Sequence, residues 1–254
     1  HLKTMEERNS QKLLRFLVFL ASENITHLFL VGDIFDLWIG HHSYFVERFR
    51  PIVDQLEILV KKGVHVHFFE GNHDLYLKHF WHDKIGVQVH ADAEVFQLGR
   101  LRVRIEHGDL INPNDRGYLF LRWFLRTSVM KCVAYHLPER MVAWVGDRAS
   151  RVSRRYTSTQ KFVHDQEIIK MIHAHTAQVF LNAGDSANNQ MHSPKSFDVL
   201  ISGHVHVRHD QQLEVGGRKI RTINLGSWFD EQKVLKLTVE QTGDPRWDWL
   251  DLHD

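Results

Sequence analysis

Four short polar segments of the chain combine glycine with histidine, aspartate or asparagine, and each follows an apolar run. They are Gly32-Asp33-Ile34-Phe35-Asp36, Gly71-Asn72-His73-Asp74, His107-Gly108-Asp109 and Gly203-His204-Val205-His206. Because a bare turn needs no imidazole, four such segments point to one shared site. Neutral imidazole and carboxylate suit borderline divalent ions such as Mn, Fe or Zn, and the absence of cysteine ligands argues against a structural zinc site. We therefore expect a two-metal site that acts on phosphoesters.

The segment 71–74 holds three different chemical groups side by side. Asn72 offers a carbonyl oxygen to a metal, and His73 can carry a proton near neutral pH. Asp74 can hold an imidazole in one orientation. The alternative interpretation is that all four segments are structural turns whose histidines lie at the surface.

Helical and strand-like patterns alternate around these segments. Helical spacing of apolar residues predicts helices over 5–22, 44–62 and about 162–177. Short apolar runs predict buried strands over 26–31, 64–69 and 197–202, a hairpin of 95–97 with 101–106, and short strands at 213–215, 219–224 and 234–239. This alternation favours a layered α/β fold, in which polar residues gather at the carboxyl ends of the strands.

Composition narrows the classes of function. The 254 residues suffice for one sizeable domain or a domain with a large insertion, and a net charge of +1 by itself favours neither nucleic acid nor membrane. The single cysteine, Cys132, excludes an internal disulfide. No run has the length of a transmembrane helix and no signal peptide is visible, so we expect a cytoplasmic protein. Because His1 leads almost directly into a helix, we also expect a strand before it.

The four segments resemble the calcineurin-like metallophosphoesterase superfamily, whose pattern is Asp-x-His, Gly-Asp-x-x-Asp, Gly-Asn-His-Asp/Glu, His and Gly-His-x-His. His1 is similar to the histidine of the first block. The resemblance implies a layered β-sandwich flanked by helices, and two divalent ions, above all Mn, with Fe or Zn as alternatives. It also implies the metal ligands: Asp33 bridges both ions, His1, His206 and an Asp before His1 bind one, and Asn72, His107 and His204 bind the other.

The same resemblance implies catalytic roles for His73 and Asp74. A carboxylate shared by two cations offsets their repulsion, and the combined charge lowers the pKa of a bridging water toward that of a nucleophile. His73 lies outside the metal shell in this scheme and protonates the leaving group. Either Asp74 or a backbone carbonyl then fixes the tautomer of His73.

A finer resemblance is to the UDP-2,3-diacylglucosamine diphosphatases of lipid A biosynthesis. It rests on the segment 32–40 with its trailing Trp38, on Asp115 eight residues past His107, and on a long insertion. It implies hydrolysis of UDP-2,3-diacylglucosamine to UMP and 2,3-diacylglucosamine 1-phosphate, with Asp115 contacting the glucosamine. One position departs from that family, which has Arg where this chain has His73, whereas the wider superfamily has His.

The insertion has a composition of its own. Between 116 and 161, ten Lys or Arg stand against only Glu139 and Asp147, interleaved with seven aromatic residues. A basic, aromatic helical module fits an anionic membrane surface and a substrate with acyl chains and phosphates, and the resemblance implies a lid over the acyl chains. The alternative is a self-packed helical hairpin with a solvated basic face. Basic residues that match the family's polar segment are Arg148, Arg151, Arg154, Arg155 and Lys161.

These patterns predict a core of 1–109 and 162–254 with a lid at 110–161. The favoured partners are a nucleotide-linked acylated sugar and the surface of the inner membrane, with no nucleic acid, and the oligomeric state stays open. Two other functions also stay open: a metallophosphodiesterase for another nucleotide-linked or cyclic nucleotide substrate, and a non-catalytic scaffold. The remaining histidines, among them His65, His67, His173 and His175, are expected in core or surface roles.

Overall fold

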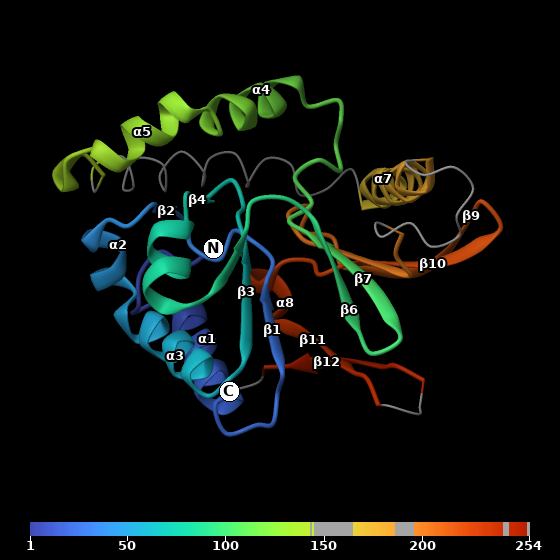
Figure 1. The fold of residues 1–254 in the computed structure, drawn as a ribbon, viewed down its shortest axis with the longest axis horizontal. Coiled ribbons are helices and arrows are strands. Elements are labelled where there is room, and N and C mark those ends of the chain that lie inside the picture. The colour runs from blue at the N-terminus through green and yellow to red at the C-terminus, as the bar shows by residue number, and fades with distance from the viewer. Residues whose placement is uncertain (143, 145–164, 186–195, 241–243, 253–254) are drawn as a thin grey trace. The chain divides into compact units, whose positions relative to one another are not determined.

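The computed structural model describes residues 1–142, 144, 165–185, 196–240 and 244–252 (Figure 1). The chain divides into two compact units, one of residues 1–91 and 113–161 and the other of 92–112 and 162–253. Each unit combines helices with β-sheet, which confirms the predicted α/β class.

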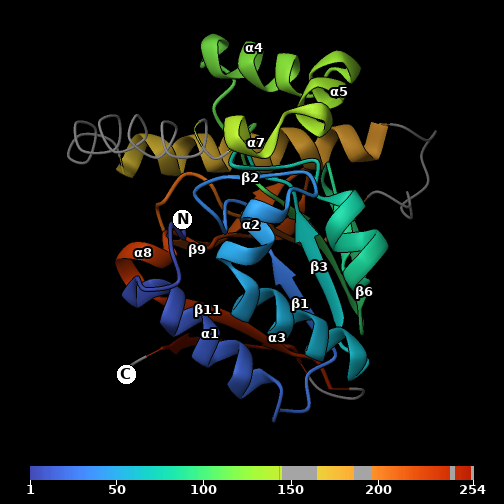
Figure 2. The same cartoon turned by 90° about the vertical axis from the view of Figure 1, so that its left-hand side faces the viewer.

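The first unit is built on a parallel sheet of β1 (His27–Leu30), β3 (His65–Phe69) and β5 (Gln88–His90), in the order β1-β3-β5. The helices α1 (Arg8–Leu20) and α3 (Arg50–Lys61) pack together on one face of this sheet (Figure 2). In the register of the sheet, Leu30 lies opposite Phe68. The loops that follow β1 and β3 therefore begin side by side at one edge, as parallel strands require.

The predicted helix 44–62 is two helices, α2 (Ser43–Arg48) and α3. The break lies at Phe49, whose backbone has φ −116° and ψ 23°, and Pro51 stands at the start of α3. Proline has no N–H to donate, and its ring clashes with the preceding helical turn. A proline is tolerated in the first turn of a helix, so the chain starts a new helix there.

Aromatic side chains beneath the first polar loop form the core of the first unit. Phe35 and Trp38 are fully buried, and their ring centroids lie 4.8 Å apart. The ring centroid of Phe35 also lies 6.1 Å from that of Trp81, which belongs to the π-helix η1 (Lys78–Ile85). Trp38 opens β2 (Trp38–Ile39), which pairs in parallel with β4 (Asp74–Leu75). Burial of each such ring stabilises the fold by about 2–3 kcal/mol, so the loop is anchored by its own apolar residues.

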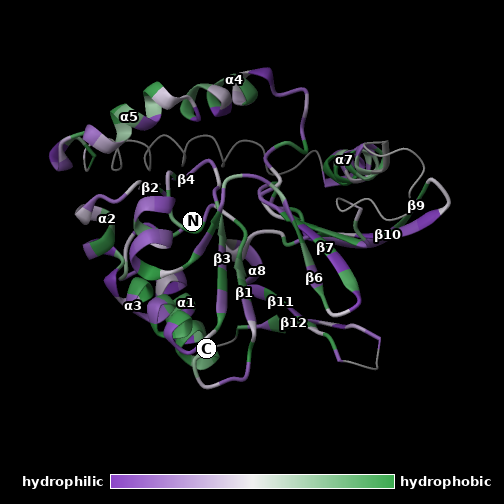
Figure 3. Cartoon of the chain, in the orientation of Figure 1, coloured by the Kyte–Doolittle hydropathy of each residue, from purple (hydrophilic) through white to green (hydrophobic). Residues whose placement is uncertain are grey.

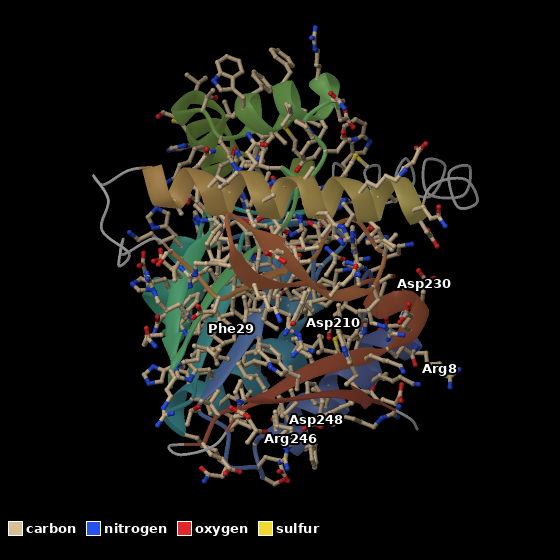
Figure 4. All side chains as sticks on the ribbon, turned by 90° about the vertical axis from the view of Figure 1, so that its right-hand side faces the viewer. Arg8, Phe29, Asp210, Asp230, Arg246 and Asp248 are labelled. Carbon is tan, nitrogen blue, oxygen red and sulfur yellow. The ribbon has the colours of Figure 1, made fainter. Side chains whose placement is uncertain are left out.

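One face of the first sheet carries histidines in register. His27 lies opposite His65, and Phe29 lies opposite His67, with the rings of Phe29 and His67 stacked at 4.6 Å. Phe29 is labelled on β1 in Figure 4. His67 Nδ1 is 3.1 Å from His90 Nε2. Burial, followed by the charges of His90, His27 and His65, lowers the pKa of His67 to about 4. His67 thus has the core role expected of it, as a neutral imidazole.

The helices α4 (Arg116–Leu125) and α5 (Ser128–His136) come from the predicted insertion. Hydrogen bonds and a small apolar cluster, in which Leu125 and Ala134 pack with Leu75 and Tyr76, attach this part of the chain to the rest of the first unit. The Tyr76 hydroxyl donates to the carbonyl of Leu125, and His42 Nε2 donates to the carbonyl of Ala134 at 2.8 Å. The carboxylate of Glu139 accepts from the backbone N–H of Ser43 at 3.0 Å. The first unit therefore holds these helices by hydrogen bonds together with this apolar cluster.

The second unit contains a five-stranded sheet in the order β6-β7-β8-β10-β9. The strands are β6 (Glu94–Leu98), β7 (Leu101–Glu106), β8 (Val199–Ser202), β9 (His209–Val215) and β10 (Arg218–Asn224). The three central strands are parallel, whereas β6 and β9 pair antiparallel at the edges. The predicted hairpin at Gly99 is confirmed, with φ +59° at that glycine. The helix α7 (Asp165–Asp185) packs on β9 and β10 and runs past the predicted end at 177.

A short helix α8 (Trp228–Glu231) and a hairpin of β11 (Lys233–Thr238) and β12 (Arg246–Asp251) complete the second unit. The pattern analysis missed β12. Arg221 on β10 links this hairpin to the sheet, because its Nε is 2.8 Å from Asp210 Oδ1 and its guanidinium lies 4.6 Å from the Trp247 ring centroid. Asp210 is labelled on β9 in Figure 4. None of the helices among the described residues is long and apolar enough to cross a membrane.

Candidate active site

The loop after β1 and the loop after β3 are joined through the carboxylate of Asp33. Asp33 has a left-handed backbone, φ +54°, which a non-glycine residue adopts at a cost of about 1 kcal/mol or more. Its Oδ1 accepts a hydrogen bond from the backbone N–H of His73 at 3.0 Å. Gly71 makes this approach possible, since a Cβ there would lie 2.2 Å from Asp33 Oδ1. Gly71 and Asp33, which belong to two separate polar segments, are thus in direct contact.

The N-terminal residues add a third group to these loops. Leu2 donates its N–H to the carbonyl of Ile34 and accepts from the N–H of Asp36, both at 2.8 Å. This bridge places His1 beside Asp33, with His1 Nε2 3.6 Å from Asp33 Oδ2. The rings of His1 and His73 meet edge-on at 4.2 Å. One ligand atom from each of His1, Asp33 and His73 lies within 4.8 Å of the others, a grouping that could hold a metal ion.

His73 is held in one tautomer by a backbone group. Its Nδ1 is 2.7 Å from the carbonyl oxygen of Asp36, so Nδ1 carries the proton and donates it. The carboxylate of the fully buried Asp74 accepts from the backbone N–H of Ile34 at 2.8 Å and of Phe35 at 3.2 Å. Of the two expected orienting groups for His73, the structure thus provides a backbone carbonyl. Asp74 instead fixes the loop from which Asp33 projects.

A buried carboxylate also lies immediately before Gly71. Glu70 accepts a hydrogen bond from the backbone N–H of Leu77 at 2.8 Å. Burial raises the pKa of Glu70, and that hydrogen bond together with the charges of Arg126 and Lys131 opposes part of the rise. The two cations come from the insertion, so they help to compensate a carboxylate beside the predicted site segment 71–74.

In the second unit, the ends of β7 and β8 bring two predicted metal ligands together. The backbone N–H of Gly203 donates to the carbonyl of His107 at 2.9 Å, and His204 Nδ1 lies 3.1 Å from His107 Nε2. His107 is buried. His204 has φ +65°, and the exposed His206 has φ +51°. Such backbone conformations outside glycine are uncommon and gather at functional sites.

Asn224 supports this loop and was not identified from the sequence. It is fully buried at the end of β10, and its side-chain amide donates to the carbonyl of Gly203 at 2.7 Å and to Ser202 Oγ at 3.0 Å. Its side-chain oxygen accepts from the N–H of Gly226 at 3.2 Å. The signal in the sequence was a polar residue ending an apolar strand, the same pattern that marked the four segments.

The remaining predicted site residues are placed as follows. Asn72 is half-buried in the loop after β3. Asp115 is exposed and caps α4, with its Oδ1 accepting from the N–H of Tyr118 at 2.9 Å. That contact explains Asp115 as a helix cap and leaves contact with a substrate sugar as a prediction. The predicted basic residues Arg148, Arg151, Arg154, Arg155 and Lys161 lie outside the described residues.

The helix α4 presents large apolar side chains to solvent. None of its ten residues is buried. Phe120 is 64% exposed and Trp123 is 63% exposed, with their ring centroids 5.7 Å apart, and Phe124 is 42% exposed. Val129 on α5 is 72% exposed. Figure 3 shows hydrophobic residues along both helices. A solvated helix does not need such residues. The surface formed by Phe120, Trp123 and Phe124, here termed the α4 apolar surface, is therefore suited to bind an apolar ligand or an apolar surface.

Comparisons with known proteins agree with this chemistry. A family model described as Calcineurin-like phosphoesterase matches residues 1–208, which include all four polar segments. A UDP-2,3-diacylglucosamine hydrolase from Aeromonas hydrophila subsp. hydrophila is 28% identical, covering 92% of this chain and 90% of its own. Proteins of the same name from Stutzerimonas stutzeri and Enterobacter sp. (strain 638) are 29% and 26% identical, each covering 94% of this chain and 92% of its own. The chain belongs to the calcineurin-like phosphoesterase family, which implies divalent metal ions and hydrolysis of phosphoester or diphosphate bonds.

Proposed function

We propose that this protein hydrolyses the diphosphate bond of UDP-2,3-diacylglucosamine and releases UMP and 2,3-diacylglucosamine 1-phosphate. The observation that carries the proposal is the similarity to proteins named UDP-2,3-diacylglucosamine hydrolase over about nine-tenths of both chains. A match of that extent spans the insertion as well as the polar segments. It therefore supports the specificity as well as the reaction.

The proposed cofactors are two Mn ions, with Fe or Zn as alternatives. The proposed ligands are Asp33, shared by both ions, His1 and His206 for one ion, and Asn72, His107 and His204 for the other. This donor set of imidazole nitrogens, carboxylate and amide oxygens fits such ions. His107 Nε2 and His204 Nδ1, 3.1 Å apart, must share either a proton or an ion. When bound, the ions would supply a water of lowered pKa and neutralise charge on the phosphoryl oxygens.

Two side chains of the protein then have separate roles. His73 transfers a proton to the leaving group, and Asp74 holds the loop that carries Asp33. Because Nδ1 of His73 donates to the carbonyl of Asp36, its second proton is carried on Nε2. Protonated His73 gives that proton to the leaving oxygen, a form of catalysis worth about 100-fold or more. Asp74 has a positioning role, since its carboxylate holds the N–H groups of Ile34 and Phe35 beside Asp33.

The α4 apolar surface binds the acyl chains in this proposal. Phe120, Trp123 and Phe124 expose apolar area on a helix of which none of the ten residues is buried. Arg116 and Arg122 lie on the same helix and add positive charge. Apolar rings beside basic residues also fit an anionic membrane surface, from which such a lipid would be taken. A peripheral contact with the cytoplasmic face of the inner membrane is therefore part of the proposal.

A second candidate function is supported by His73. The diacylglucosamine family has Arg at this position, whereas the wider superfamily has His. A histidine acid favours substrates with poor leaving groups, such as a cyclic nucleotide or another nucleotide-linked phosphodiester. The alternative is a metallophosphodiesterase of that specificity.

The test is a substrate panel on the purified protein with Mn. UMP release from UDP-2,3-diacylglucosamine is expected, and it should be abolished by EDTA and by Asp33→Asn. A nucleotide diphosphate sugar without acyl chains should be turned over at least tenfold more slowly. No turnover of the lipid beside good turnover of a cyclic nucleotide or of the acyl-free compound would reject the first function in favour of the second.

A further inference from the structure

A buried ion-pair network lies directly before the predicted metal ligand His107. The carboxylate of Glu106 is buried at the end of β7, and its Oε2 accepts from Arg104 Nε at 2.9 Å. Its Oε1 contacts Nε2 of His175, which comes from α7. Glu106 is therefore held by a basic side chain of its own strand and by His175 from α7.

Glu106 is the last residue of β7, and His107 follows it directly in the chain. Successive side chains in a strand alternate between faces, so the face of Glu106 is the one that α7 covers. Glu106 pairs with Ser202 in the β7–β8 ladder, and the next backbone contact is from Gly203 to His107. A carboxylate held from the α7 side thus restricts how the peptide carrying the His107 imidazole can rotate.

Two further side-chain contacts join α7 to the sheet. Thr176 Oγ1 lies 2.9 Å from Thr222 Oγ1, two residues before Asn224. His173 Nε2 lies 2.8 Å from His209 Nε2, three residues after His206. Of these three contacts of α7, the contact of His175 with Glu106 involves a residue directly next to a predicted metal ligand, His107. Replacing a buried ion pair by apolar residues is often neutral for stability, so stability alone does not account for a buried Glu–His–Arg network.

We propose that His175, acting through Glu106, is a positioning residue that orients His107 and so sets how tightly His107 and His204 bind a divalent ion. The inference rests on the proposed function, because it takes both histidines as metal ligands. It assigns a role to a histidine that the pattern analysis placed among bystanders. Groups that hydrogen-bond a metal ligand typically change metal affinity by 10–100-fold when removed, and for a group that acts through the backbone we expect the lower end of that range.

The test measures Mn binding by equilibrium dialysis with metal analysis, beside thermal unfolding in EDTA. His175→Ala should lower the affinity for one Mn by about 10-fold. His175→Gln should restore most of the affinity, because its amide can still donate to Glu106. Thr176→Val is the matched control, since it removes another buried contact of α7 and should lower stability without changing Mn affinity.

Each outcome decides between the explanations. Equal Mn affinity for His175→Ala and the unchanged protein overturns the inference, as does a Gln variant that is stable yet binds as weakly as the Ala variant. If His175→Ala does not fold, the double variant Glu106→Met with His175→Leu keeps the volume and removes the pair. Mn affinity unchanged in that variant, or a failure of it to fold as well, shows a purely structural pair. No Mn binding by the unchanged protein would reject the proposed function itself.

Discussion

Gly71→Ala tests whether the close approach of two loops builds the site. The new Cβ would lie 2.2 Å from Asp33 Oδ1 and 2.6 Å from the Asp33 backbone nitrogen. Ordinary contact begins at 3.4 Å, so one of the two loops must move by 3.4 − 2.2, or about 1.2 Å. The displaced group is backbone as well as carboxylate, so a side-chain rotation cannot relieve the clash. A displacement of about 1 Å in a catalytic group costs about 100-fold in rate.

The assay for Gly71→Ala combines kcat/KM for UMP release, Mn content and urea denaturation. We expect kcat/KM to fall by about 100-fold, Mn content to fall, and stability to decrease by about 1–3 kcal/mol from overpacking. Gly117→Ala is the control, because a Cβ there meets only Asp115 Oδ1 at an ordinary 3.6 Å. It should keep the Mn content and stabilise α4 by about 0.5–1 kcal/mol. Activity and Mn content within threefold of the unchanged protein for Gly71→Ala would refute the reasoning.

Three further predictions concern His73, His67 and the α4 apolar surface. His73→Ala should lower kcat by about 100-fold on substrates with poor leaving groups and leave Mn content intact; loss of the metal instead would make His73 a ligand. The pKa of His67 is about 4 in the fold against 6.5 as the ordinary value, so the unfolded state binds more protons between these values. The contribution of neutral His67 to stability is then fully present above pH 6.5 and is lost as the pH drops toward 4. Between pH 7 and 5 the free energy of unfolding should fall by about 1–2 kcal/mol after allowance for solvent screening. Urea denaturation at both pH values should show a smaller loss for His67→Leu than for the control His79→Gln, and equal losses would contradict the assignment. Phe120→Ser with Trp123→Ser should abolish co-sedimentation with phosphatidylglycerol vesicles, whereas Val18→Ser with Phe19→Ser, on α1, should not; equal binding by both variants would remove the surface from the proposal.

Local patterns in the sequence identified the groups that carry the chemistry. A histidine or aspartate beside glycine at the end of an apolar strand depends only on neighbouring residues, so Asp33, His73, His107 and His204 were visible without a structure. The parallel-strand argument also predicted that the loops after β1 and β3 meet. The hydrogen bond from the His73 N–H to Asp33 is the physical form of that meeting. The break between α2 and α3 was likewise present in the sequence, as Pro51, and was overlooked.

The tertiary structure alone decided which groups orient the predicted ligands and acid. His73 takes its proton position from the carbonyl of Asp36, 37 residues away, although Asp74 is its neighbour in the chain. Asn224 holds the Gly203 loop from 21 residues away, and His175 reaches Glu106 across 69. Periodicity and spacing describe only what lies within a few residues along the chain. A hydrogen bond between distant segments depends on how strands and helices pack. The residue types therefore indicated a metal-dependent hydrolase, whereas the tertiary structure determined which hydrogen bonds hold the predicted site residues in place.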